Sequence, residues 1–457
     1  MDVGSSKLKA ALYGADGHAA SVYHVDSPLQ GEVVRADAVL DAIALAAETV
    51  CDGRRPTAMA ITGATRTHVL AGPDGQALDA ITKLDDARGA EFEDDIKRAY
   101  GEVHARGMGA FHPLARLLDT KARQPKLYAA AHWQLELKDW INLQLSGIVA
   151  TDNISHARQQ PQHVPFEAVV TRLQLRPNLY PAPMPAASVL GSVRVHPDAR
   201  LARLQGVPLV QCGFDAWCAS FGMGCVRDRQ VYNVSGTTEV FGSFSTGGRY
   251  MSGVSCLQWT PDLRHLGGPC LTGLATLSWF GRTFLNDSNP RSVMDCAALA
   301  GDDCPLCLPF ISGERMPFWN ADLSAQFLQV RSHHGLPEFA RALLDGLMVF
   351  QRFLLARLCP FAESIYLSGG ATALEGWVAL KANAFERPVS LCAASEPSLL
   401  GATMSALAAV GVYTDIAQAQ TALTPSCIVT QPDRAAAQRM TCVEQRLLPH
   451  LTLLIQP

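Results

Sequence analysis

Ser235-Gly-Thr-Thr238 and three similar short segments decide the fold of this chain. Each is a polar or glycine-rich turn beside an apolar segment, and such turns let backbone N–H groups approach phosphate oxygens closely. One glycine turn is weak evidence, because most large proteins contain several. Four turns in a fixed order predict a nucleotide site built from both halves of the chain. The other three are Asp2-Val-Gly-Ser-Ser6, Gly213-Phe-Asp-Ala216 and Ser368-Gly-Gly-Ala371.

Composition excludes several classes of partner. The 457 residues are 48% hydrophobic and 18% charged, which is typical of a globular enzyme with two or three domains. The net charge is −4 and the basic residues are scattered, so neither nucleic acid nor an anionic membrane is an expected partner. The 13 cysteines are dispersed and no secretory signal is visible, so we expect reduced thiols and a cytoplasmic protein. A small molecule is the expected partner.

Helical and strand-like segments alternate along the chain, which predicts an α/β protein with mainly buried strands. Short apolar runs at 58–62, 207–211, 231–234 and 364–368 end at glycine or polar residues, as strands that feed active-site loops do. Residues 336–358 show the apolar spacing of one buried helix face. We place the domain junction near 227–230, which predicts domains of residues 1–228 and 229–457.

Longer segments resemble the FGGY family of carbohydrate kinases, in the arm that includes xylulokinase. Leu308-Pro-Phe-Ile-Ser-Gly-Glu-Arg-Met-Pro317 is very similar to the family's lPyl.GER.P segment. Residues 138–147 and 151–157 resemble its kDyi…LTG…tD.s.A segment, and 367–371 its adenosine region. The resemblance implies two actin-like, ribonuclease H-like domains with a cleft between them for ATP and sugar. It also implies ATP- and Mg²⁺-dependent phosphorylation of a sugar or polyol hydroxyl.

The resemblance assigns roles to the turn residues. Asp2 matches the family's magnesium carboxylate and Asp215 its proton-accepting aspartate, although Asp215 equally suits a helix N-cap by local sequence. Family members carry several apolar residues before the magnesium aspartate, whereas only Met1 precedes Asp2. Either the start is short or the reading frame was opened late, and an Asp2 left flexible by a short start would bind metal more weakly. Each glycine turn has the alternative of being an ordinary tight turn. The residues expected at the nucleotide are Gly4, Ser5, Ser6, Lys9, Gly236, Thr237, Thr238, Gly369, Gly370, Ala371 and Asn383.

The substrate side departs most from the family. Gly63-Ala-Thr-Arg66 replaces its GQMH turn, and Leu84-Asp-Asp-Ala-Arg88 replaces its W.D.R segment. Arg66 either donates to a sugar carboxylate or vicinal hydroxyls, or is a surface arginine paired with Asp74 or Asp85. The sequence leaves open the sugar, the hydroxyl, and whether the chain acts alone or as a homodimer. The expected sugar contacts are Arg66, Asp86, Arg88 and Asp215.

Two other functions compete with the kinase. One is a catalytically impaired actin-like ATP-binding relative with a regulatory or interaction role, and the other is an actin-like ATPase unconnected with sugars. Sugar-dependent ADP release, nucleotide binding without turnover, and sugar-independent hydrolysis distinguish the three.

Overall fold

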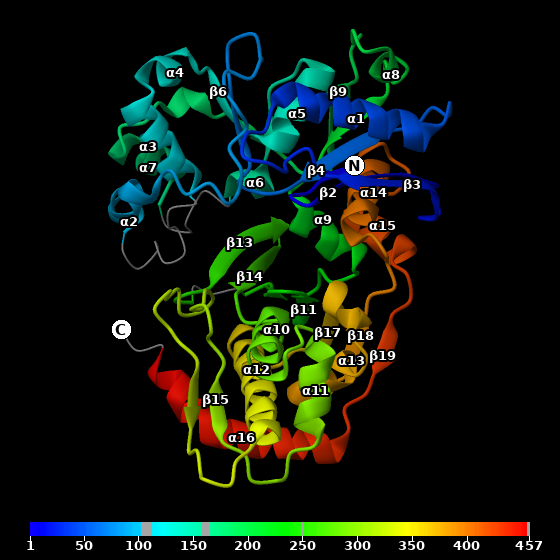
Figure 1. The fold of residues 1–457 in the computed structure, drawn as a ribbon. Helices are drawn as coiled ribbons and strands as arrows, with labels where there is room; N and C mark the ends of the chain where they lie inside the picture. The colour runs from blue at the N-terminus through cyan, green and yellow to red at the C-terminus, as the bar shows by residue number, and fades with distance from the viewer. Residues whose placement is uncertain (102–111, 158–163, 248–250, 261, 455–457) are drawn as a thin grey trace. The chain divides into compact units, whose positions relative to one another are not determined.

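The computed structural model describes residues 1–101, 112–157, 164–247, 251–260 and 262–454. The chain forms two compact units: the first comprises residues 1–224 and 394–425, and the second 225–393 and 426–457. Each contains a mixed sheet with helices (Figure 1). The first unit thus ends four residues before the predicted boundary at 228, and it also includes a segment from far along the chain.

The return of residues 394–425 to the first unit depends on close helix packing. Helix α14 (Pro397–Ala409) packs against α9 (Asp215–Gly222), and glycines make the contact tight. A Cβ on Gly401 would lie 1.8 Å from the Cys218 carbonyl oxygen, and one on Gly222 would lie 2.0 Å from the Pro397 carbonyl oxygen. Only glycine permits this approach of two backbones. Local sequence gives no sign of a contact between segments so far apart.

The first unit is built on a six-stranded sheet in the order β3-β2-β1-β4-β10-β9. Strand β1 is antiparallel to β2 and parallel to β4, and β4 is parallel to β10. Because carboxyl ends of parallel strands share one edge, the turns after β1, β4 and β10 leave from the same edge. The strands are β1 (Asp2–Val3), β2 (Lys7–Tyr13), β3 (Ala19–Asp26), β4 (Met59–Gly63), β9 (Ser188–Ser192) and β10 (Pro208–Gln211), with the pairs β5 (His68–Ala71) and β6 (Trp133–Glu136), and β7 (Thr151–Asp152) and β8 (Pro183–Met184).

Helices of the first unit cover this sheet and form a second small core. Helix α1 (Ala36–Cys51) buries Val39, Ile43 and Val50 at helical spacing in the sheet core. A separate cluster forms around α2, α3 and α7. The remaining helices of the unit are η1 (Ala90–Phe92), α2 (Glu93–Tyr100), α3 (Pro113–Arg123), α4 (Pro125–Ala130), α5 (Leu137–Ser146), α6 (Asn153–Ala157), α7 (Phe166–Arg172), η2 (Pro177–Leu179), α8 (Ala199–Ala202) and α15 (Ile416–Leu423).

The second unit repeats the same strand pattern in a seven-stranded sheet ordered β13-β14-β12-β11-β17-β18-β19. Strand β11 is antiparallel to β12 and parallel to β17, which is parallel to β18. The pattern places the turns after β11 and β17 side by side. The strands are β11 (Gln230–Ser235), β12 (Glu239–Ser245), β13 (Ser255–Thr260), β14 (Leu263–Cys270), β17 (Ser364–Ser368), β18 (Val389–Leu391) and β19 (Ile428–Thr430), with the separate pair β15 (Leu306–Leu308) and β16 (Gln326–Leu328).

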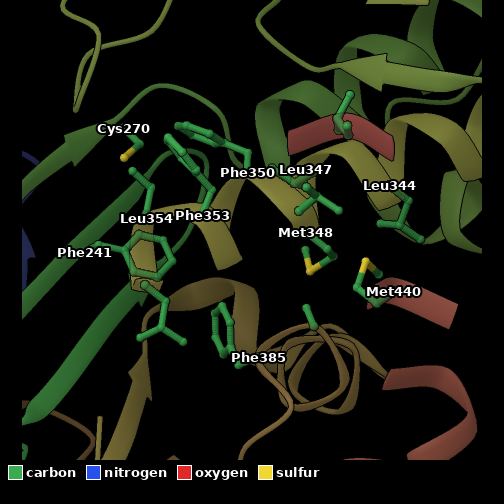
Figure 2. Packing of buried hydrophobic residues seen from close by; sticks show 14 of the residues in the cluster. Phe241, Cys270, Leu344, Leu347, Met348, Phe350, Phe353, Leu354, Phe385 and Met440 are labelled. Carbon is green, nitrogen blue, oxygen red and sulfur yellow. The ribbon is translucent and has the colours of Figure 1, made fainter. Parts of the chain in front are cut away.

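Helix α12 (Leu336–Leu358) lies in the core of the second unit. It is buried over more than the single face that its periodicity predicts, because strands β12 and β15 and four helices, α10, α11, α13 and α16, pack around it. Figure 2 shows Phe353 and Leu354 toward Phe241 of the sheet, and Leu344 and Met440 at the other end of the cluster. The other helices are α10 (Leu274–Phe280), η3 (Gly281–Leu285), α11 (Pro290–Ala298), η4 (Gly370–Ala373), α13 (Trp377–Phe385) and α16 (Arg434–Leu453). Among the described residues, none of the helices has the length and apolarity needed to cross a bilayer.

Candidate functional site

Asp2 is held on both sides of its strand rather than being flexible, in contrast to the expectation from its position in the sequence. It pairs with Lys9 of β2 and Thr62 of β4. The Met1 ammonium donates to the Ala60 carbonyl oxygen at 2.8 Å, and the Thr62 N–H donates to the Met1 carbonyl oxygen at 2.9 Å. These bonds fix the direction in which the Asp2 side chain leaves the sheet.

The Asp2 carboxylate is buried, with one oxygen unused. Asp2 is 6% exposed. Its Oδ2 accepts a hydrogen bond from Ser398 Oγ at 2.7 Å, whereas its Oδ1 has no hydrogen-bond partner among the described residues. Burial raises the pKa of Asp2, partly opposed by the Ser398 hydrogen bond and the Lys9 charge. A buried carboxylate oxygen without a partner is costly, and a divalent cation would satisfy it. The residue therefore fits a magnesium ligand.

The turn between β1 and β2 carries the other predicted residues of this group. The Gly4 N–H donates to the Lys7 carbonyl oxygen at 3.1 Å, and Ser5 and Ser6 are exposed at its tip. Lys9 Nζ lies 2.7 Å from Glu396 Oε2, so the lysine is already paired with a carboxylate. Sequence reasoning missed Glu396, which lies directly before α14 and is 387 residues from its partner.

Asp215 is the first residue of α9, after the loop that follows β10. Phe214 occupies the N-cap position, so the N-cap interpretation of Asp215 is wrong. Its Oδ1 accepts the Ala216 N–H at 2.7 Å, and the residue is half-buried. The positive end of the helix favours the ionised carboxylate, which is the form a general base needs.

Arg116 of α3 joins the two loops predicted to bind the sugar. Its residue is 3% exposed, and its guanidinium donates to the carbonyl oxygens of Arg66 at 2.8 Å, Leu84 at 2.7 Å and Asp86 at 2.9 Å. Burial lowers its pKa to about 10. Sequence reasoning missed this residue. Its only signal in the sequence was an arginine placed between apolar residues in a helical segment, where a charged residue needs a partner.

The three predicted sugar residues of these loops differ in their surroundings. Arg66 is half-buried with φ 56°, and its charge adds to burial in lowering the pKa of His112. Arg88 Nη2 lies 2.7 Å from Asp86 Oδ2, and its Nε lies 2.9 Å from the same oxygen. Burial would raise the pKa of Asp86, but hydrogen bonds from Arg88 outweigh it and lower the pKa. Asp86 and Arg88 thus bind each other.

The predicted phosphate turn of the second unit is a hairpin between β11 and β12. The Gly236 N–H donates to the Thr238 carbonyl oxygen at 3.0 Å, and Thr237 and Thr238 are exposed. The first amides of α10 hold the turn from behind, since Leu274 N–H donates to the Gly236 carbonyl oxygen at 3.0 Å. The turn therefore presents two hydroxyls on a fixed backbone.

The predicted adenosine turn lies directly beside this hairpin. Gly369 has φ 97°, and a Cβ there would lie 2.4 Å from the Ser235 carbonyl oxygen. Gly370 faces open space, whereas Ala371 is buried. The structure thus brings together two turns that are more than 130 residues apart in the sequence. Both the backbone conformation and the close approach require glycine at 369.

A buried polar network supports both turns from below. Lys381 Nζ donates to Asn233 Oδ1 at 2.7 Å and to Glu239 Oε1 at 3.0 Å. Trp377 Nε1 donates to Ser235 Oγ at 2.8 Å, and that hydroxyl donates to Glu239 Oε1 at 2.8 Å. Burial lowers the pKa of Lys381, and the Glu239 charge opposes this. Sequence reasoning missed the network, although a charged residue in an apolar strand was a signal for Glu239.

Two further residues hold loops of the second unit. Glu314 is 2% exposed and accepts the N–H groups of Leu271 at 2.6 Å and Thr272 at 3.1 Å, in the loop that leads into α10. Burial raises the pKa of Glu314, and these hydrogen bonds oppose the rise. Asn383, predicted at the nucleotide, uses its Oδ1 to accept the Asp433 N–H at 2.7 Å at the start of α16. Its oxygen therefore has a role within the fold.

Comparison with known proteins identifies the class. Residues 231–410 match the C-terminal domain of the FGGY family of carbohydrate kinases. A xylulose kinase of Staphylococcus epidermidis is 24% identical over 247 residues, which cover 52% of this chain and 50% of the relative. An erythritol kinase of Brucella abortus is 26% identical over 414 residues, covering 79% and 75%. The match thus spans about half the length of the first of these relatives.

Solved structures agree over the whole chain. A gluconate kinase from Lactobacillus acidophilus has a TM-score of 0.90 at 18% identity, covering 99% of this chain and 97% of that one. A ligand-bound xylulose kinase from the same species has a TM-score of 0.88 at 18% identity, with the same coverage. Residues 231–410 are thus similar to the C-terminal domain of the FGGY family of carbohydrate kinases, and the whole chain shares the fold of these solved kinases. The predicted actin-like fold and family resemblance are confirmed.

Proposed function

We propose that this chain transfers a phosphoryl group from ATP to a hydroxyl of a small sugar or polyol, with Mg²⁺. The observation that carries the proposal is the contact between the turns at Ser235 and Gly369, which gives the second unit adjoining surfaces for the phosphates and the nucleoside. The relatives named above are kinases of xylulose and erythritol. Phosphoryl transfer needs positioning and charge neutralisation more than covalent chemistry, and the residues described supply both.

Asp215 is the proposed general base. A sugar hydroxyl is a weak nucleophile at neutral pH, and a carboxylate in hydrogen-bond reach orients it and accepts its proton as the bond to phosphorus forms. The position at the start of α9 suits this role, because a helix N-terminus favours negative charge and the Ala216 N–H restrains one oxygen.

Asp2 is the proposed magnesium residue, through Oδ1. The cation, when bound, would neutralise charge on the ATP phosphates. Ser398 holds the other carboxylate oxygen, which orients the side chain. Ser5 and Ser6 would donate to phosphate oxygens from the turn that follows, and Gly4, whose N–H donates to the Lys7 carbonyl oxygen, would hold the shape of that turn. Lys9 is already paired with Glu396, so only part of its positive charge would act on the ATP phosphates.

In the second unit, Thr237 and Thr238 would donate their hydroxyls to the phosphates, and the backbone of Gly369 to Ala371 would lie against the nucleoside. Gly370, beside open space, lets the nucleotide reach the backbone. Asn383 is the weakest member of the proposed set, since its oxygen already accepts the Asp433 N–H.

Arg66, Asp86 and Arg88 are the proposed sugar contacts, and Arg116 is a positioning residue for them. Arg116 donates to three carbonyl oxygens in two loops, so it ties the loops to each other. The Asp86–Arg88 pair offers a guanidinium edge and carboxylate oxygens to hydroxyl groups. Leu84, 39% exposed, leaves this wall without an aromatic ring, so the pocket would differ from that of the family pattern.

A coupled ADP-release screen over ketoses, polyols, aldoses and sugar acids tests the proposal. We expect release that depends on one class of sugar and on Mg²⁺, and that is lost in Asp215→Asn. Asp198→Asn, which alters an aspartate that caps α8, is the matched control and should keep full activity. Nucleotide binding without turnover on any substrate would favour the impaired relative. Hydrolysis that ignores sugars would favour the ATPase.

A further inference from the structure

Two cysteines lie at the open end of the antiparallel pair formed by β18 and β19, at one edge of the second unit's sheet. The register of this pair ends with Leu391 opposite Ile428. Cys392 directly follows β18, and Cys427 directly precedes β19. Continuing the register by one position therefore sets Cys392 opposite Cys427. We call these two residues the β18–β19 cysteine pair.

The backbone direction of Cys392 indicates how closely the two cysteines approach each other. Its N–H donates to the Leu367 carbonyl oxygen of β17 at 3.1 Å, so its backbone hydrogen-bonding groups are directed away from β19. Opposite residues of antiparallel strands that exchange no hydrogen bonds have Cα atoms about 4.5 Å apart. The Cα atoms that a disulfide joins usually lie about 4.4–6.8 Å apart. The register thus gives the β18–β19 cysteine pair a spacing that a disulfide can span.

The two side chains of the pair share one neighbourhood, which small solutes can reach. Both cysteines are half-buried. Burial raises the pKa of the Cys427 thiol, and a hydrogen bond from the backbone of Ala393, the residue next to Cys392, opposes the rise. The Cys427 sulfur therefore lies beside the chain at Cys392. Cys225 is a third thiol in this neighbourhood, but it is 0% exposed, and charges on the pair add to burial in raising its pKa.

The pair stands where the chain leaves the second unit and where it returns. Residues 394–425 belong to the first unit, and each cysteine of the pair lies two residues outside this segment. A bond between the two sulfurs would therefore close the whole segment into one covalent loop. The segment contains α14 with Ser398, whose hydroxyl donates to Asp2. The bond would thus join the two ends of the segment that orients this carboxylate.

We propose that the β18–β19 cysteine pair is a redox modification site, which a hydroperoxide converts into a reversible disulfide that closes residues 394–425 into a loop. One thiolate first attacks the peroxide, whose O–O bond breaks, so that a sulfenic acid forms and hydroxide or an alkoxide leaves. The second thiolate then attacks the sulfenic sulfur, the S–S bond forms and hydroxide leaves. Protons from the two thiols convert the leaving groups to water or an alcohol, and two electrons pass from the sulfurs to the peroxide. A small thiol reverses the change by thiol–disulfide exchange.

Peptide mapping of the full chain tests the proposal. The protein is treated with hydrogen peroxide, alkylated and digested with trypsin and an Asp-N protease, which place the pair on separate peptides, 382–414 and 415–432, with one cysteine each. We expect these peptides to appear joined, two hydrogens lighter than their sum, and to separate after treatment with dithiothreitol. A product in which either peptide is joined to Cys225 instead would overturn the proposal.

Three serine variants control for reactions of other thiols. Cys392→Ser and Cys427→Ser should each abolish the joined product. Cys442→Ser, which alters an exposed cysteine of α16, is the matched control and should keep it. Oxidation of Cys442 in the wild type without any joining of the two peptides would show that the pair does not react, and the proposal would be wrong.

Thermal unfolding gives a second readout. A disulfide restricts the unfolded chain, and the effect grows with the length of the closed loop. We expect the Tm of the peroxide-treated wild type to lie about 5 °C or more above that of the reduced protein, and Cys427→Ser to show no such rise. A joined product without a rise in Tm would contradict the proposed closure of residues 394–425.

Discussion

Replacing Lys381 by methionine tests the buried network under the two nucleotide turns. Lys381 and Glu239 are both 0% exposed, and the lysine supplies the only cation within 4 Å of that carboxylate among the described residues. Methionine keeps most of the side-chain volume but leaves Glu239 with hydrogen bonds from Asn233 and Ser235 alone. Leaving one charge of a buried pair unpaired costs about 3–5 kcal/mol. We expect the free energy of unfolding of the second unit to fall by that amount.

A double-mutant cycle separates the pair from simple loss of packing. Urea unfolding is measured for the wild type, Lys381→Met, Glu239→Gln and the double variant, each with and without ATP. The double variant should recover about half or more of the single loss, because it contains no unpaired charge. ATP affinity should fall in Lys381→Met, since Ser235 and Trp377 belong to the same network. A loss below about 1 kcal/mol in the single variant, with no coupling, would refute the reasoning.

Three further changes test individual residues. Gly369→Ala should weaken ATP binding about tenfold or more, because its Cβ would lie 2.4 Å from the Ser235 carbonyl oxygen. Gly376→Ala is the control: its φ is also positive, but the nearest atom to its Cβ would be 3.5 Å away. It should cost about 1 kcal/mol of stability and leave ATP affinity unchanged. Arg116→Lys should raise the sugar KM about tenfold and leave the ATP KM unchanged, whereas Arg123→Lys, at an exposed site of the same helix, should alter neither. Asp2→Asn should abolish the stabilisation by Mg-ADP yet raise Tm at pH 7 without metal. Burial raises the folded-state pKa of Asp2 above 3.8, so its contribution to stability is greatest below pH 3.8 and is lost as pH rises through the folded-state value. Calorimetry between pH 4 and 8 checks this, and parallel pH profiles for both proteins would contradict it.

The sequence predicted those strands whose pattern lies within a few consecutive residues. The run 364–368 coincides with β17, and 58–62 and 231–234 lie within one or two residues of β4 and β11. These are buried strands that end at glycine or polar turns, and both properties are legible in a few consecutive residues. The contact between the turns at 235 and 369 was implied only by the family resemblance, because it depends on strand order.

The contacts that sequence reasoning missed are long-range. Glu396 reaches Lys9 only because α14 returns to the first sheet, and no local pattern carries that return. Arg116 binds carbonyl oxygens, which every residue possesses, so its partners leave no mark in the sequence. Asp215 shows a local limit instead. The sequence predicted its place after a strand, but a shift of one residue in where the helix begins decides whether Asp215 or Phe214 is the N-cap.

The turnover of Asp215→Asn on the sugar found in the screen tests the proposed function most directly. Asparagine keeps an oxygen that can accept the Ala216 N–H, now 2.7 Å from Asp215 Oδ1, but it cannot accept the proton of the sugar hydroxyl. We predict an unchanged Tm and ADP affinity, with kcat lowered by about 10²- to 10⁴-fold. A folded Asp215→Asn protein that turns over at close to the wild-type rate would contradict the proposed mechanism.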